Sequence, residues 1–203
     1  LLGLTLCAGM AQAKTLKIGM SSEARSMDPF FHNETSTNSV LSNIFEGLTY
    51  FDKDLKVYPV LAESWEVNGD TEWIFKLKQG VTFHNGNPFN ADDVLYSFDR
   101  VKNWDKSGFK SHVNMIETIE KLDDYTIKIT TKGPYPTLLR KLVAVKILDK
   151  EFASTKTDDE LGLQPVGTGP YKFVSWKKGD SITLTENADY REGKPFYSDV
   201  IIK

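Results

Sequence analysis

The stretch from Trp65 to Val101 constrains the fold most, because the spacing of its apolar residues changes from that of a strand to that of a helix. Residues 65–67 and 72–78 alternate between apolar and polar on either side of Asn68-Gly69-Asp70. This pattern is typical of two strands joined by a tight hairpin turn. Gly80–Phe83 is expected to extend the sheet, and Asn85-Gly86 to form a second turn. The stretch therefore predicts paired strands that lead into a helix.

The expected helix begins at Asn90, a residue type that caps helices by accepting a hydrogen bond from the first turn. Asp92 and Asp93 fall in that first turn, where the helix dipole favours negative charge. An apolar stripe for the core follows at Val94, Leu95, Phe98 and Val101. The start of a helix therefore explains both aspartates without a catalytic role.

Other periodic segments predict a chain that mixes strands and helices. Strands are expected at Lys14–Met20, 123–132, 143–148, 171–176, 181–187 and 198–203, and helices at Thr35–Leu48 and 134–143. The turn Lys178-Gly179-Asp180 is expected to separate the strands at 171–176 and 181–187.

Residues 1–13 (LLGLTLCAGMAQA) have the features of the end of a secretory signal peptide. The segment from Leu1 to Met10 is apolar and too short to span a bilayer, and Ala11-Gln12-Ala13 is a small-x-small cleavage site. A buried N-terminal strand is the alternative. A lipid anchor would require Cys7, but the residue before it is Leu6 and not a small residue. The segment therefore predicts a soluble exported protein whose mature form lacks cysteine.

Composition and motifs offer little support for catalysis, metal binding or nucleic-acid binding. The net charge is −3 with no run of Lys and Arg, so no nucleic-acid partner is expected. The three histidines, His32, His84 and His112, lack zinc-ligand spacing, and His84 is expected to stabilise the Asn85-Gly86 turn. Gly167–Lys172 (GTGPYK) lacks the Lys-Ser/Thr ending of a phosphate loop, so a tight crossing into a strand is expected. No catalytic residues, metal ligands or cofactor are predicted.

Three segments together closely resemble the family 5 extracellular solute-binding proteins, which serve bacterial ABC importers for peptides, nickel, haem and glutathione. They are Leu61–Val67 (LAESWEV), Trp73–Phe98 (WIFKLKQGVTFHNGNPFNADDVLYSF) and Pro165–Phe173 (PVGTGPYKF). The segments "SMDPFF" and "NADYREGKP" occur in the order that the family shows. The resemblance covers essentially the whole mature chain.

The resemblance implies an α/β, two-lobed periplasmic-binding-protein-like (type II) fold, of which this chain holds the N-terminal lobe and its inserted subdomain. Residues 14–48 and 165–203 would form the ligand-binding lobe, with the return segment truncated, and residues 49–164 the inserted subdomain. The implied protein is a periplasmic monomer that captures peptides and delivers them to permease subunits. The ATPase subunits are separate, so the chain itself needs no nucleotide motif.

In peptide-binding members of the family, the segment after the first strand pairs with the ligand backbone as an added strand. The matching residues here are Ser21, Ser22, Glu23, Ala24 and Arg25. Glu23 would meet a cationic group and Arg25 a carboxylate, unless both are solvated loop charges. Lys146, alone in an apolar run, is a further candidate that either faces the cleft or extends from a sheet edge.

Three alternative functions stay open from the sequence. A receptor for nickel chelate, haem, glutathione or another small solute would use the same fold. A secreted hydrolase would need a nucleophile and base that no motif supplies. A signalling receptor domain would be followed by a transmembrane segment.

Overall fold

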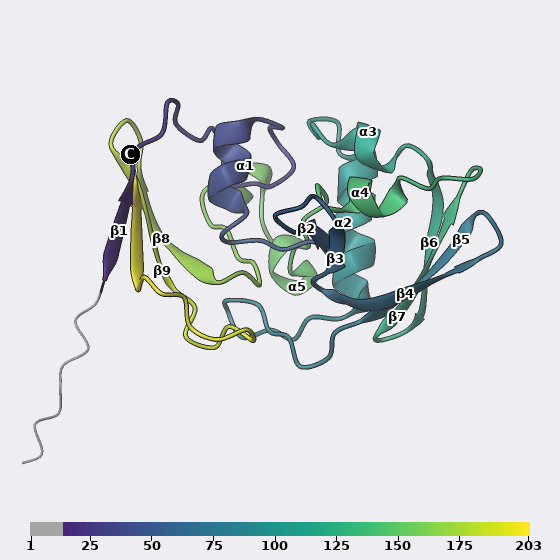
Figure 1. The fold of residues 1–203 in the computed structure, drawn as a ribbon. Coiled ribbons are helices and arrows are strands. Elements are labelled where there is room, and N and C mark those ends of the chain that lie inside the picture. The colour runs from purple at the N-terminus through teal and green to yellow at the C-terminus, as the bar shows by residue number, and fades with distance from the viewer. Residues whose placement is uncertain (1–13) are drawn as a thin grey trace, which may run out of the picture.

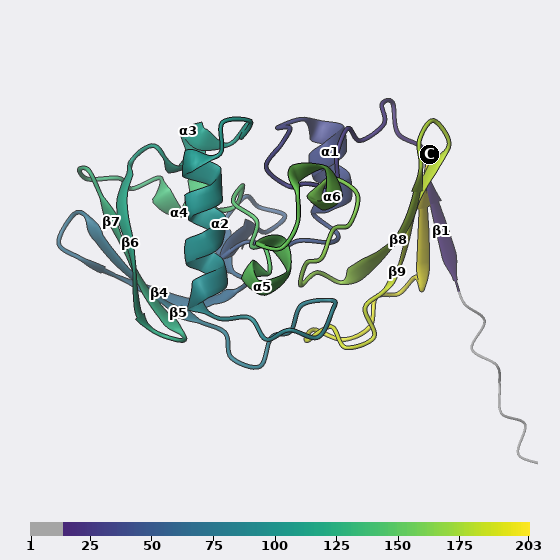
Figure 2. The same ribbon diagram turned by 180° about the vertical axis from the view of Figure 1, so that it is seen from behind.

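The computed structural model describes residues Lys14–Lys203, so the expected signal peptide at 1–13, with Cys7, lies outside the described residues. Two four-stranded sheets lie at opposite ends of the molecule, with helices between them (Figure 1; Figure 2 shows the reverse side). In order across the sheet, the first contains β1 (Thr15–Ile18), β10 (Asp199–Ile202), β9 (Ser181–Glu186) and β8 (Tyr171–Lys177). The second contains β4 (Ala62–Asn68), β5 (Glu72–Leu77), β7 (Thr126–Thr131) and β6 (Ile116–Asp123).

Shorter elements connect the two sheets. A two-stranded ribbon is formed by β2 (Thr49–Phe51) and β3 (Val57–Pro59). The helices are α1 (Thr35–Leu41), α2 (Ala91–Asn103), α3 (Lys110–Val113), α4 (Leu138–Leu142), α5 (Lys150–Ala153) and α6 (Asp158–Leu161).

The first sheet joins segments that are far apart in the sequence. Strand β1 pairs in parallel with β10, and β10 pairs antiparallel with β9, so the two ends of the described chain share one sheet. The middle of the chain builds the second sheet, in which all neighbouring strands are antiparallel. Met20 N donates to Lys203 O, just after β10, so the segment that follows β1 starts beside the end of β10. Because β10 pairs with β9, the same segment also lies near the hairpin of β8 and β9.

The hairpin and helix expected between residues 65 and 101 are confirmed. Strands β4 and β5 pair antiparallel, with Val67 opposite Trp73, and Gly69 takes the left-handed conformation (φ 62°) that the tight turn requires. Helix α2 begins after Asn90, whose side chain accepts from Asp92 N, and Asp93 completes a capping box. Asn85 and Asn87 both donate to Asp149 Oδ2, at 2.7 and 2.8 Å.

Two expected strands are wrong, and one expected helix is shorter than predicted. Gly80–Phe83 contributes only an isolated bridge between Thr82 and Pro88, and residues 143–148 contribute only one between Lys146 and Gly47. Both runs are apolar because their side chains are buried, although their backbone is irregular. A short apolar run alone does not distinguish a buried irregular segment from a strand. The helix expected to reach Leu48 ends at Leu41. The carbonyls that would continue it accept hydrogen bonds from the 167–171 segment, as Ile44 O does from Gly169 N.

The Gly167–Lys172 segment is the tight crossing into β8 that its glycines predict. A Cβ at Gly167 would overlap the carbonyl oxygen of Ile44, and one at Gly169 would lie 2.6 Å from that of Asn43. Glycine is therefore required where this segment passes the end of α1.

Beside this crossing, Glu46 is buried and carries a bonded network. Its carboxylate accepts from both terminal nitrogens of Arg191, from Tyr190 Oη and from Thr168 Oγ1. The network joins the segment after α1 to the segment between β9 and β10.

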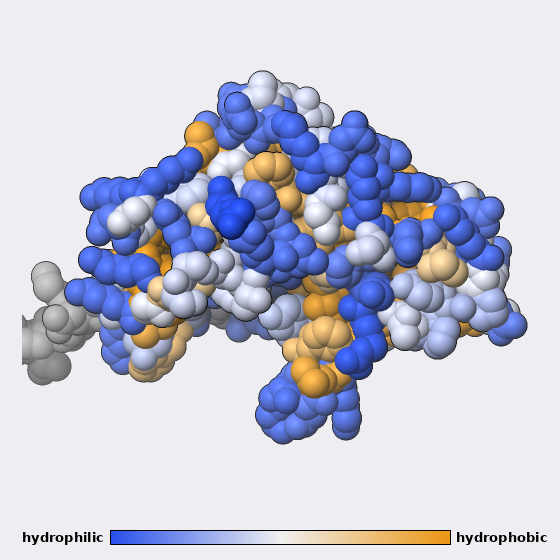
Figure 3. Space-filling model, turned by 90° about the horizontal axis from the view of Figure 1, so that it is seen from above, coloured by the Kyte–Doolittle hydropathy of each residue, from blue (hydrophilic) through white to orange (hydrophobic). Residues whose placement is uncertain are grey.

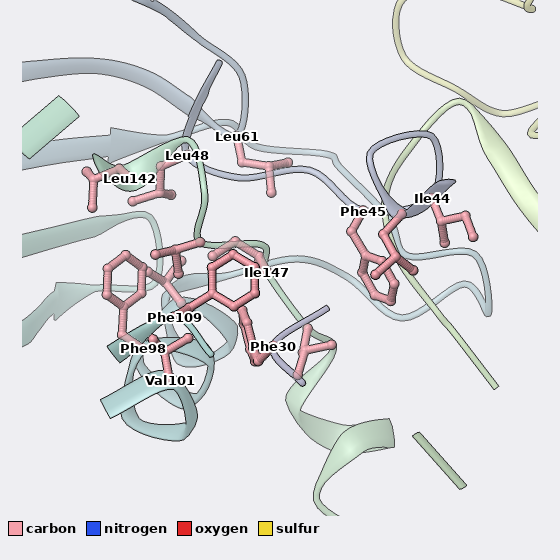
Figure 4. Packing of buried hydrophobic residues seen from close by; sticks show 14 of the residues in the cluster. Phe30, Ile44, Phe45, Leu48, Leu61, Phe98, Val101, Phe109, Leu142 and Ile147 are labelled. Carbon is pink, nitrogen blue, oxygen red and sulfur yellow. The ribbon is translucent and has the colours of Figure 1, made fainter. Parts of the chain in front are cut away.

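One hydrophobic core runs from the first sheet to the second. Phe30 and Phe45 belong to segments near the N-terminus, and they pack in the same cluster as Leu61, Phe98 and Ile147 (Figure 4). Seen from above, hydrophobic residues reach the surface as separate groups among hydrophilic ones (Figure 3). No helix within residues 14–203 is long and apolar enough to cross a membrane.

Candidate functional site

The segment Ser21–Arg25 leaves β1 and runs toward α1 without forming a strand of its own. Ser21, Ser22 and Glu23 are exposed, whereas the Ala24 side chain is buried in the core. The buried alanine fixes the segment to the lobe while its neighbours face outward. The structure therefore brings together all five residues expected from the sequence on one exposed run of chain.

The backbone of this segment has unused hydrogen-bonding capacity. Within the described part of the chain, no N–H or C=O of Ser21, Ser22, Glu23 or Ala24 takes part in a hydrogen bond. The run is held at both ends, because Met20 N donates to Lys203 O at 2.6 Å and Arg25 N donates to Thr37 Oγ1 at 3.2 Å. It is thus a stretch of irregular chain, held at both ends, whose peptide groups are free to pair with another strand.

Glu23 is positioned by the hairpin of β8 and β9. Its Oε1 accepts from Trp176 Nε1 at 2.7 Å and from Gly179 N at 3.0 Å. The Trp176 bond, followed by the Gly179 bond, lowers the pKa of this exposed carboxyl from its ordinary value. The carboxylate is therefore ionised at neutral pH. Both donors bind the same oxygen, so Oε2 has no hydrogen-bond partner among the described residues.

Arg25 has a partner that it can exchange. Its Nε lies 3.2 Å from Glu34 Oε2, and the two side chains are 63% and 37% exposed. A surface ion pair of this kind contributes about 1 kcal/mol or less, because water screens both charges. The Arg25 guanidinium can therefore turn to another carboxylate with little loss of stability.

Two hollows flank the segment. The first, about 160 Å³, is lined by Ser22, Glu23 and Ala24 on one side and by Ile182 and Lys203 on the other. The second, about 340 Å³, is lined by Arg25, Phe31, Trp104, Lys106 and Trp176, among others. Both combine apolar surface with a few charged groups, as small-molecule sites commonly do.

An ion network contributes part of the lining of the larger hollow, through Asp28, Trp104 and Asp158. Asp28, from the "SMDP" motif, is buried and accepts from Arg100 Nη2 and from Phe30 N. Asp158 accepts from the same Arg100 nitrogen at 3.2 Å and from Trp104 Nε1 at 3.0 Å. These bonds fix Trp104 and α6 beside Arg25, so the hollow is preformed.

Lys146 lies apart from the residues around Ser21–Arg25 and lines neither hollow. Its Nζ is 3.5 Å from Val143 O and 5.3 Å from the centre of the Tyr50 ring. Burial lowers its pKa to about 8, partly offset by the negative charge of Glu46. Its position is at the bridge to Gly47, so its expected role in ligand binding stays a prediction.

His84 bonds to a different segment from the one expected. Its Nε2 lies 2.9 Å from Gly169 O, and Gly167 N donates to its Nδ1 at 3.4 Å. Burial lowers its pKa to about 4, so the ring is neutral, with Nε2 as donor. The expectation that His84 stabilises the Asn85-Gly86 turn is therefore corrected, because its side chain bonds to the glycine crossing at Gly167 and Gly169.

The sequence interpretation missed the side chains that complete the site. The sequence pattern places Trp176 in a strand and Gly179 in a turn, and it indicates no role for Trp104. The alternation of β8 and β9 predicts their hairpin, but no local pattern links position 23 with position 176. That contact depends on the parallel pairing of β1 with β10.

Within residues 14–203, no group of three or more His, Cys, Asp or Glu side chains is arranged to hold a metal ion. The arrangement around Ser21–Arg25 offers unbonded backbone groups, one fixed carboxylate and one exchangeable guanidinium. These features can bind and orient a small polar molecule.

Comparison with known proteins assigns the class. The model of the bacterial extracellular solute-binding proteins, family 5, matches residues 56–203, and the chain belongs to this family. Solved relatives show that the fold is that of the periplasmic binding proteins. The ABC transporter-associated periplasmic binding protein DppA from Helicobacter pylori, in complex with the peptide STSA, is 32% identical with a TM-score of 0.85. The match covers 93% of this chain and 42% of that one.

Two further relatives are associated with different ligands. NikZ from Campylobacter jejuni, in complex with Ni(L-His), is 32% identical with a TM-score of 0.85, over 93% of this chain and 38% of that one. The glutathione-binding protein GsiB of Pectobacterium atrosepticum is 35% identical over 181 residues, which are 88% of this chain and 35% of the relative. The chain thus spans about a third of the length of this curated relative.

Proposed function

We propose that the chain belongs to the substrate-binding component of an ABC transporter, which captures peptides in the periplasm and delivers them to a membrane permease. The observation that carries the proposal is the unpaired backbone of Ser21–Ala24, fixed at both ends between two hollows. Family membership and the peptide held by the DppA relative support it.

In the proposed mode, the peptide lies beside Ser21–Ala24 as an added strand, and its backbone supplies the missing hydrogen-bond partners. Glu23 directs Oε2 to a cationic group of the ligand, while Trp176 and Gly179 hold Oε1. Arg25 exchanges Glu34 for a ligand carboxylate. No bond is made or broken, so the proposed role needs no catalytic residue and no cofactor.

The division into lobes is part of the proposal. Residues 14–48 and 165–203 share the first sheet and hold the Ser21–Arg25 segment, and they are proposed as one wall of the ligand cleft. Residues 49–164 are proposed as the subdomain inserted into that lobe. A second lobe in a longer protein would supply the opposite wall, and ligand would shift the protein, acting as a monomer, to a closed form that the permease recognises.

A second candidate ligand is glutathione, because a relative that is 35% identical is a glutathione-binding protein. Glutathione carries both an ammonium group and carboxylates, so it suits the same pair, Glu23 and Arg25. A nickel chelate, haem or another small solute would use the same fold.

Calorimetric titration tests the proposal on the 203-residue chain and on a longer protein that contains it. The ligands are a pool of di- to pentapeptides, glutathione and nickel–histidine. Saturable binding of peptides to the longer protein, at least tenfold weaker in the chain alone, is expected because one wall leaves the ligand exposed to water. Glutathione binding without peptide binding would favour the second candidate. Binding of neither would contradict the proposal.

A further inference from the structure

A third hollow lies away from the proposed peptide site, at α4 and the neighbouring β2 strand. Its volume is about 410 Å³, and Phe51, His112, Arg140 and Lys141 are among its lining residues. It shares no lining residue with the two hollows beside Ser21–Arg25. Every charged or titratable side chain that lines it is basic, and no Asp or Glu contributes to the lining.

Arg140 is held in place without an acidic partner. Its guanidinium lies 4.9 Å from the centre of the Phe51 ring, and Nη1 donates to Leu55 O at 3.3 Å. Elsewhere in residues 14–203, the arginines at 25, 100 and 191 each form a salt bridge with a carboxylate, whereas Arg140 forms none. A guanidinium has five N–H donors in a planar fork that matches an oxyanion, so most of the donors of Arg140 remain free.

Lys141 follows directly on α4 and also has no carboxylate within salt-bridge distance among the described residues. It is close enough to His112 that its charge helps to lower the pKa of the imidazole, after the larger effect of burial. Two neighbouring cations and a neutral imidazole therefore face one hollow without a compensating anion.

His112 lies against the same hollow. Its side chain contributes to the lining, whereas Nδ1 itself is buried on the side of the Phe109 backbone, whose hydrogen bond to the ring partly offsets the lowering of its pKa by burial. The ring packs 5.5 Å from that of Phe109, centre to centre, which limits its orientation.

We propose that this hollow binds an oxyanion, with Arg140 and Lys141 supplying positive charge and donors beside the His112 ring. The bound group is a phosphate-like or carboxylate oxyanion, since both present the acceptor oxygens that these donors require. The site lies on the proposed inserted subdomain, so it is separate from peptide capture and does not depend on it.

A nuclear magnetic resonance titration of His112 tests this proposal on the purified protein. Ring resonances are followed from pH 4 to 9 in inorganic phosphate, in acetate and in sodium chloride of matched ionic strength. The His112→Asn variant assigns the signal. A bound anion favours the protonated ring, so phosphate or acetate should raise the pKa of His112 by about half a unit or more over the chloride value. A response to phosphate alone would define a phosphate-type site, and a response to both a general oxyanion site.

Variants separate a specific site from general screening. Lys141→Gln and Arg140→Gln should each reduce the apparent anion affinity by about fivefold or more, while Lys177→Gln, an exposed lysine on β8, should leave it unchanged. Because Arg140 also contacts Phe51, circular dichroism checks its fold, and Lys141→Gln alone is a sufficient test. An equal shift in chloride, no saturable shift, or an unchanged response in Lys141→Gln would overturn the proposal.

Discussion

Residues 81–98 and residues 21–25 are both rich in polar groups, but they use them differently. In the first region, His84 bonds to Gly169 and Asn90 caps α2. The side chains of Asn85 and Asn87 both donate to Asp149. In the second, the backbone of Ser21–Ala24 makes no hydrogen bond in the described part of the chain. The first region is therefore satisfied internally and acts as scaffold, whereas the second retains the capacity to bind.

Charge follows the same division. Glu46, buried at the crossing, has its carboxylate fully occupied by Arg191, Tyr190 and Thr168. Glu23, on the exposed segment, has both of its donors on one oxygen. A saturated buried carboxylate stabilises the fold, and an exposed one with a free oxygen can meet a ligand. Substitutions in the two regions should consequently separate stability from binding.

The largest expected effect is at the buried network. Glu46→Ala leaves Arg191 buried without its partner, so the free energy of unfolding should fall by about 4 kcal/mol. Urea denaturation measures this change. The control is Glu120→Ala, which removes an exposed partner of Lys128 and should cost less than about 1 kcal/mol. Equal losses in the two variants would show that the Glu46 network does not stabilise the junction.

The next effect is a pH dependence from His84. Its folded pKa of about 4 lies below the ordinary value of 6.5, so its contribution is complete above pH 6.5. As pH falls from 6.5 to 4 the unfolded chain gains a proton that the folded protein does not, and about 3 kcal/mol of stability should be lost. Urea denaturation at several pH values should show this slope in the natural protein and a flatter one in His84→Gln. Identical slopes would contradict the assignment of a neutral buried ring.

A smaller effect is expected at the start of α2. Asn90→Ala removes the side-chain acceptor for Asp92 N and should cost about 1 kcal/mol, while Asn90→Asp should be nearly neutral. Thermal unfolding measures both variants, and calorimetry checks that ligand affinity is unchanged. Weaker binding with normal stability would move this region from scaffold to site.

The smallest effect on stability is expected at Glu23. Glu23→Gln keeps an oxygen that accepts from Trp176 and Gly179 but removes the negative charge. The melting temperature should not change, while peptides with a cationic group should bind about tenfold more weakly, since a charge-assisted hydrogen bond is lost. Titration of lysine-containing peptides beside neutral ones measures the difference. An equal loss for both kinds of peptide would argue against a charge contact.

Local sequence signals predicted the parts of the fold that depend on neighbours in the chain. The hairpin at Asn68-Gly69-Asp70, the cap at Asn90 and the hairpin of β8 and β9 all rest on turn or cap residues beside a periodic pattern. The segments that failed, residues 80–83 and 143–148, are apolar because they are buried where several segments cross. A short apolar run carries no information about whether its backbone pairs as a strand.

The site could be predicted only in part. The segment Ser21–Arg25 came from the family resemblance, and its free backbone became visible only in the structure. The contact of Glu23 with Trp176 joins residues 153 positions apart, and the unpaired state of Arg140 depends on which carboxylates surround it in space. Such features are set by tertiary packing, so no local pattern contains them.

Amide hydrogen exchange is the most direct test of the claim that ligand pairs with the Ser21–Ala24 backbone. The unbonded amides of Ser22, Glu23 and Ala24 should exchange rapidly in free protein and become protected when a peptide binds. The amides of α2 (Ala91–Asn103), already bonded, should show little change. Saturable binding that leaves Ser22–Ala24 unprotected, with protection confined to other segments, would contradict the account.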